Sequence, residues 1–474
     1  MKKVFFRLLF FIAFAAAAFI GFRIWNKNEP LQYFDADTQC IVAMDGIRNK
    51  DFLEVWPFLE TLFREEEAPT PEEIQKNRKY LSKLYLLADT SGSGKKRKTV
   101  AIADPGLYYY LALFRAKTWL DDDHGVYRLK EEVLDEQGEK YPLLRKLRLD
   151  FGNGLIFVAQ SAEDLQYFKG KAVQYREKRK GEKNKAPAAV AEDQKRKEVR
   201  EILDDNRKKL LTALWFFPEN GLGLTALSFS NYAKNEVFYQ DAVLYFREEV
   251  DAPVFEGSDM RKLARVKGDA WAYLSLRDYS DLNRILLLYD FFTSLGESPE
   301  KARDVLSGPY RVSNSTKEAL FFLQLLSGIT LEDELKNIDR EILLSVDEKM
   351  LVIAVKKTDR VKKIVRKIDI PKETVAIDEE KKTVRITLPF LEDLAAVNPT
   401  LQDRIPELAK NQFLAANIPM GTVTPLLPED WSWLSAFRNI EITGQGKEIR
   451  IHTSCNLEDY NRAVENIREK NKGN

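Results

Sequence analysis

The strongest constraint on the fold is the order of strand-like and helical segments between Gly268 and Ile377. Residues 270–276 alternate in polarity, which is typical of a strand with one buried face. After them the sequence predicts a helix at 282–292, strands at 338–346 and 350–355, a helix at 359–368 and a strand at 374–377. This order predicts the split βαβ unit of a ferredoxin-like domain.

A second set of segments nearer the N-terminus has the same order. Residues 37–44 can be laid over 269–276, and both stretches begin with an aspartate, Asp37 and Asp269. Four further elements have counterparts, namely strands at 81–87 and 98–103, a helix at 107–119 and a strand at 126–129. The sequence therefore predicts an α+β fold of two related domains, at 33–250 and 265–470, joined by a linker at 251–264.

Each predicted domain also carries antiparallel hairpins outside the ferredoxin-like core. Residues 375–377 and 384–388 flank a short polar turn, the pattern of a two-stranded hairpin. Each half ends in another hairpin, with 224–230 facing 237–246 in the first and 440–443 facing 448–453 in the second.

The N-terminal segment predicts the compartment. Residues 8–22 carry no charge, and 4–25 is long enough for the roughly 20 residues of a membrane span if Arg7 and Arg23 reach the two surfaces. We expect residues 1–30 to form a single transmembrane signal anchor in the inner membrane, with the bulk of the chain on the periplasmic side. The alternative is a cleaved signal peptide, with Ala15 and Ala17 at the cleavage site, and a soluble periplasmic protein.

The charge balance and the scarcity of reactive residues bear on function. Basic and acidic residues number 74 each, so no overall field favours nucleic acid. Two histidines and two cysteines supply few of the usual parts of metal or nucleophile chemistry, and we predict no catalytic residue, metal or cofactor. Cys40 and Cys455 could form a disulfide in an oxidising compartment or remain separate buried thiols.

A charged insertion at 171–210 distinguishes the first predicted domain. It holds 14 Lys or Arg and 8 Asp or Glu, and we expect two polar helices on either side of a loose tip. The first helix follows Ser161, which begins a capping-box-like sequence with Asp164 three residues later. The insertion is either a solvated arm or a contact for anionic lipid headgroups.

Two predicted helices are apolar around most of their circumference, at 108–114 and 319–326. Such helices are usually buried between layers of a fold. The alternative is an apolar groove for an acyl chain or a partner helix, lined by Tyr109, Phe114, Phe321 and Leu325.

A family resemblance rests on Asp269–Leu276, Leu331–Leu335 and Glu341–Leu344. In these stretches the chain resembles uncharacterised, N-terminally anchored bacterial envelope proteins that form a family of unknown function. The resemblance implies duplicated α+β modules and a membrane anchor, and it carries no catalytic residues.

These observations predict a non-catalytic binding or scaffolding protein of the bacterial cell envelope. Its partners would be the membrane, through the N-terminal helix, and an envelope protein or lipid, but not nucleic acid. A carrier or sensor for a lipid-like apolar ligand is the alternative, and a hydrolase without a recognisable motif is the third reading.

Overall fold

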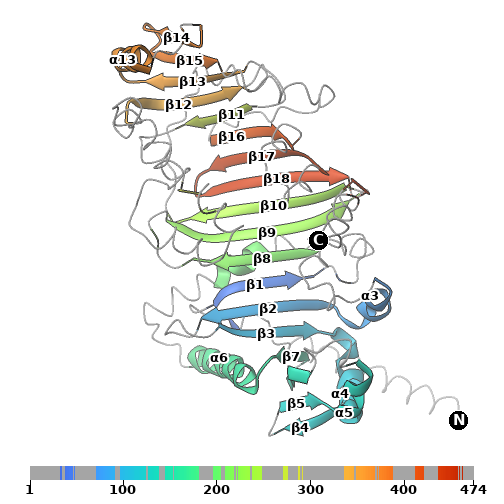
Figure 1. Ribbon diagram of the computed structural model, residues 1–474. Helices are drawn as coiled ribbons and strands as arrows, with labels where there is room; N and C mark the ends of the chain where they lie inside the picture. The colour runs from blue at the N-terminus through green and yellow to red at the C-terminus, as the bar shows by residue number, and fades with distance from the viewer. Residues whose placement is uncertain are drawn as a thin grey trace, which may run out of the picture. The chain divides into compact units, whose positions relative to one another are not determined.

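The chain forms two compact units. Figure 1 labels their helices and strands. Unit 1 comprises Met1–Trp215 with Ser230–Ala233, and unit 2 comprises Phe216–Phe229 with Lys234–Asn474. The computed structural model describes most of residues 71–180, 209–247, 336–387 and 436–462, and shorter stretches at 33–47, 196–203, 271–275, 287–291 and 412–420, with gaps inside these ranges. The predicted linker at 251–264 lies outside the described residues.

Unit 1 is built on an antiparallel sheet with the order β8-β1-β2-β3-β7-β6-β5-β4. Its strands are β1 (Thr38–Met44), β2 (Lys83–Thr90), β3 (Arg97–Asp104), β4 (Leu120–Asp123), β5 (Val126–Leu129), β6 (Arg148–Gly152), β7 (Leu155–Ala159) and β8 (Leu211–Phe216). Its helices are α3 (Pro71–Asn77), η2 (Arg78–Tyr80), η3 (Gly106–Tyr108), α4 (Tyr109–Trp119), α5 (Glu131–Gln137) and α6 (Ala162–Lys180).

Unit 2 is also an antiparallel sheet, with the order β14-β15-β13-β12-β11-β16-β17-β18-β10 and with β9 paired to β10. Its strands are β9 (Leu224–Lys234), β10 (Val237–Phe246), β11 (Trp271–Ser275), β12 (Ile338–Ser345), β13 (Met350–Val355), β14 (Val375–Asp378), β15 (Thr383–Thr387), β16 (Gln412–Pro419), β17 (Phe437–Gln445) and β18 (Glu448–Asn456). Helix α13 (Thr358–Ile368) packs on β14 and β15.

The prediction of a duplicated ferredoxin-like α+β core is wrong, although most of the predicted strands and helices exist. A split βαβ unit needs its first and third strands to be parallel neighbours. Instead β1 pairs antiparallel with β2, and β11 pairs antiparallel with β12. The fold is mostly antiparallel sheet. Alternating polarity identifies a strand and its buried face but not the direction of its neighbour, and this is why the prediction failed.

The predicted hairpins agree with the structure. β14 and β15 pair around the turn at 379–382, and β17 and β18 pair around Gly446. β10, the second strand of the predicted hairpin at 224–246, continues the sheet of unit 2 by pairing with β18 over nine residue pairs, from Val237↔Asn456 to Tyr245↔Glu448. Strands separated by some 200 residues of sequence therefore share one sheet.

Helix α6 begins as the sequence predicts and covers one side of the unit 1 sheet. The backbone N–H of Asp164 donates to Ser161 Oγ at 3.1 Å, which is the expected N-terminal cap. Leu165 and Phe168 are buried, and α6 packs on β3, β6 and β7. Part of the charged insertion is thus a docked helix, while 181–195 and 204–208 lie outside the described residues.

The ion pair between Lys171 of α6 and Asp89 is buried. Lys171 Nζ bonds to Asp89 Oδ2 of β2, and the two side chains are 7% and 0% exposed. The ammonium also lies 4.8 Å from the centre of the Tyr167 ring. Buried charges need such partners, so this contact ties α6 to the sheet.

Within the described residues, no helix combines the length and apolar character required to cross a membrane. The predicted signal anchor at 1–30 lies outside those residues. Both cysteines of the chain are described, Cys40 in β1 and Cys455 in β18, and both are thiols.

Candidate binding surface on helix α4

The start of α4 is fixed by a turn after β3. Asp104 ends the strand, and its Oδ1 accepts a hydrogen bond from the Gly106 N–H at 3.0 Å. Gly106 has φ of 59°, a left-handed conformation that favours glycine. The single turn η3 then leads into α4 without a break.

One side of α4 is packed against the sheet. Tyr109 is 7% exposed, and its ring centre lies 6.3 Å from that of Phe151 in β6. Phe151 in turn meets Tyr127 of β5 edge to face at 5.6 Å. Ala116, two turns after Tyr109, is also buried. These contacts fix the rotation of α4 about its axis, because residues seven apart share a helix face.

The opposite side of α4 presents large apolar side chains to solvent. Phe114 is 77% exposed, and Trp119 at the last turn is 51% exposed. Tyr110 and Leu111 precede Phe114 by four and three residues, so all three lie on one side of the helix. Tyr108, at the end of η3, is also exposed.

A sixth exposed side chain, the ring of Tyr80, extends this surface to η2. Tyr80 of η2 meets Tyr108 edge to face with ring centres 5.1 Å apart. Lys79 places its ammonium 4.9 Å from the centre of the Tyr80 ring. We call this surface the aromatic face and define it by Tyr80, Tyr108, Tyr110, Leu111, Phe114 and Trp119.

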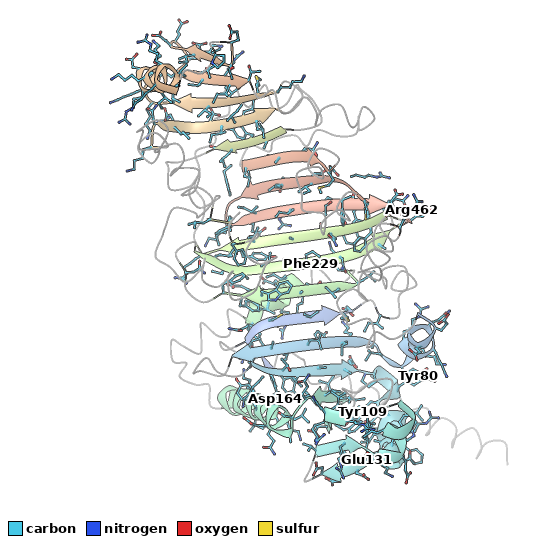
Figure 2. All side chains as sticks on the ribbon, in the orientation of Figure 1. Tyr80, Tyr109, Glu131, Asp164, Phe229 and Arg462 are labelled. Carbon is cyan, nitrogen blue, oxygen red and sulfur yellow. The ribbon has the colours of Figure 1, made fainter. Side chains whose placement is uncertain are left out.

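Charges of both signs border the aromatic face. Exposed Lys79 lies at its η2 end, and exposed Arg115 lies on α4 itself. At the other end the Lys130 N–H donates to the Trp119 carbonyl at 2.9 Å, which brings the start of α5 to Trp119. Glu131 and Glu132 follow there and are exposed. Figure 2 labels Tyr80, Tyr109 and Glu131 on these elements.

The side chains of the aromatic face are suited to binding a partner rather than to catalysing a reaction. Its members are rings, phenol hydroxyls and one leucine, which offer contact area and hydrogen bonds. The described residues contain no group of three His, Cys, Asp or Glu side chains placed to hold a metal ion.

The four predicted site residues have different positions. Tyr109 points inward, as the buried-helix reading expects, whereas Phe114 is among the most exposed apolar side chains of the described residues. Phe321 and Leu325 lie outside the described residues, so the apolar groove that the four were expected to line stays a prediction.

Sequence reasoning missed most of the aromatic face. Tyr80 and Trp119 were not singled out, because they lie at the ends of separate segments. A usable signal was present, since helical spacing places Tyr110, Leu111 and Phe114 together with Arg115 on the side opposite Tyr109.

Comparison with known proteins gives little further information. No protein-family model and no curated protein matches this sequence. Three crystal forms of a protein named TP0453 are similar over part of the chain. Form IV is 10% identical, with the match covering 46% of this chain and 80% of TP0453 at a TM-score of 0.27. Form I is 9% identical, covering 51% and 89% at a TM-score of 0.25. Form III is 9% identical, covering 51% and 87% at a TM-score of 0.27. Similarity at this level supports no statement about the fold or role of this chain.

Proposed function

We propose that this chain is a non-catalytic binding or scaffolding protein of the bacterial cell envelope, and that the aromatic face of unit 1 receives a partner protein. The envelope location rests on residues 1–30, whose sequence favours a single-pass inner-membrane anchor with the remaining chain in the periplasm. The binding role rests on the aromatic face.

The concentration of exposed apolar side chains is the observation that carries the proposal. Nine large hydrophobic side chains of the described residues are exposed, and six of them form the aromatic face. Isolated exposed apolar residues are normal on soluble surfaces, but a contiguous group marks an interaction site. Tyrosine and tryptophan are also the residue types enriched where partner proteins bind most strongly.

The bordering charges favour a protein partner over a bilayer. An anionic membrane pressed against the aromatic face would meet Glu131 and Glu132 beside Trp119 and would be repelled. A protein surface can match both signs, with acidic groups near Lys79 and basic groups near Glu131. A mixed polar border around an apolar centre is the usual composition of protein interfaces.

The carrier alternative gains no support from the inner side of α4. A ligand cavity there would need unfilled space beneath the helix. Tyr109, Phe151 and Tyr127 instead contact one another in series, as in an ordinary packed core.

Site-specific photocrosslinking in intact cells tests this function. A photoreactive phenylalanine analogue at Phe114 of the full-length chain should give a discrete protein adduct. The same analogue at Glu132, exposed on α5, tests whether the adduct is confined to the aromatic face. The adduct at position 114 should also disappear when Tyr110→Ser and Trp119→Ser are added.

Two results would count against the proposal. If position 114 crosslinks only to lipid, the aromatic face is a membrane contact. If it gives no adduct, or one unchanged by the two added substitutions, the face is not the binding surface.

A further inference from the structure

Helix α13 of unit 2 carries an unusual local charge. Residues 356–367 include seven basic side chains and one acidic side chain, Asp359, although basic and acidic residues balance over the chain as a whole. The basic residues are Lys356, Lys357, Arg360, Lys362, Lys363, Arg366 and Lys367. All of them except Lys362 are exposed. The exposed basic side chains of 356–367 therefore form a local positive surface on a protein with no net charge.

The helix is oriented so that these charges face outward. Val361, Ile364 and Val365 are partly buried where α13 packs on β14 and β15. Arg360, Lys363 and Lys367 are spaced by three and four residues and thus form one row along the helix. Arg366 lies beside that row. We call Arg360, Lys363, Arg366 and Lys367 the basic row.

The entry to α13 is held firmly by one buried side chain. Asn337, 5% exposed, accepts a hydrogen bond from the Lys357 N–H through Oδ1 at 3.0 Å and donates from Nδ2 to the Lys357 carbonyl at 3.0 Å. Its own carbonyl accepts from the Lys356 N–H at 2.8 Å. The backbone at the entry to α13 is thus fixed before binding, so the conformational entropy lost on binding is mainly that of the side chains.

Two carboxylates on and beside α13, those of Asp359 and Glu379, are engaged by Lys362, which lies outside the basic row. Lys362 pairs with Glu379 and lies 3.6 Å from Asp359 Oδ1. Its pKa is raised, first by the hydrogen bond to Glu379. For Lys363, Arg366 and Lys367, the described part of the chain supplies no ion-pair partner. Their charges are thus available to an external anion.

We propose that the basic row of α13 is a docking surface for a bilayer rich in anionic phospholipid. The charges are spread along one outward side of a helix, a geometry that meets a flat array of phosphate headgroups. The apolar side of the helix is occupied by the sheet, so contact is electrostatic and superficial. Such contact contributes about fivefold in affinity per basic residue near the surface and weakens with salt.

Lysine footprinting of the full-length chain tests the docking. The protein is placed in nanodiscs of zwitterionic lipid alone or with roughly one third phosphatidylglycerol, and acylation rates of single lysines are measured by mass spectrometry. Lys363 and Lys367 should react several-fold more slowly in the anionic discs, and raised salt should abolish the difference. Lys146, exposed in unit 1, is the internal control and should react equally in both.

A charge-matched pair of variants isolates the basic row. Arg360→Gln with Arg366→Gln leaves both reporter lysines in place and should remove most of their protection. Arg128→Gln with Arg145→Gln removes two exposed arginines of unit 1 and should leave it unchanged. Equal acylation rates in the two kinds of disc would overturn the proposal. So would protection by a single-stranded oligonucleotide without protection by anionic lipid.

Discussion

The rings of Tyr80 and Tyr108 meet edge to face with their planes 89° apart, although both residues are exposed. The contact joins η2, which follows α3, to η3, which leads into α4. Because it lies at the surface, it contributes little to folding. Its consequence is instead a continuous apolar surface drawn from two segments that are about 28 residues apart in the sequence.

Substitutions on the two sides of α4 should have opposite consequences. Phe114→Ser should change the free energy of unfolding by less than about 0.5 kcal/mol, because its ring is mostly in water, while removing partner binding. Tyr109→Ala should lower the stability of unit 1 by about 3 kcal/mol, because it leaves a cavity against Phe151. Hydrogen exchange of unit 1 peptides measures the change in stability of each variant. A large loss of protection in Phe114→Ser would mean that the ring is packed.

The buried pair between Lys171 and Asp89 should be strongly coupled. Lys171→Met leaves the Asp89 carboxylate buried without this cation and should cost about 3–5 kcal/mol in denaturant unfolding. Adding Asp89→Leu to that variant should recover most of the loss. The exposed pair of Arg462 and Glu458, with a 3.0 Å contact, is the control. Glu458→Gln should cost less than about 1 kcal/mol. Equal losses in the single and double variants would show that the pair is uncoupled.

Two glycines should respond to alanine with opposite signs. A Cβ at Gly444 of β17 would lie 2.7 Å from the buried Phe413 ring and 2.9 Å from the Leu414 Cβ. Gly444→Ala should therefore destabilise unit 2 by about 1–3 kcal/mol. At Gly170, within α6, a Cβ would meet nothing within 4 Å. Gly170→Ala should stabilise α6 by up to about 1 kcal/mol, because glycine is costly inside a helix. Thermal melts compare the two, and a stabilised Gly444→Ala would contradict the close approach.

Cys455 should make stability depend on pH at alkaline values. Burial raises the pKa of its thiol from 9.0 to about 12, so the folded state favours the neutral form. The stabilisation is complete below pH 9 and is lost as pH rises towards 12. The stability of the wild type relative to Cys455→Ala should thus fall by about 2 kcal/mol between pH 7 and pH 10.5. Paired denaturant titrations measure this gap, and one that stays constant would show that the thiol ionises freely in the folded protein.

The sequence alone predicted the local elements well. The strands at 350–355 and 440–443, the helix at 359–368 and the cap at Ser161 all appear in the structure. Each depends on residues close in the chain, such as alternating polarity, helical spacing or a hydroxyl three residues before an N–H. The sequence also shows the positive charge of α13, because residues 356–367 hold seven basic side chains and one acidic side chain.

Only the tertiary structure decided which strands are neighbours and which side of α4 is exposed to solvent. The antiparallel pairing of β10 with β18 joins Val237 to Asn456, and no local pattern specifies a partner so distant. The side chains of 108–114 are apolar around the helix, so their own periodicity does not choose a buried side, and the signal in the sequence is the charge of Arg115 beside them. The contact of Tyr109 with Phe151 fixes the buried side of α4 and leaves Phe114 in solvent, because a helix packed against one sheet can bury only one side.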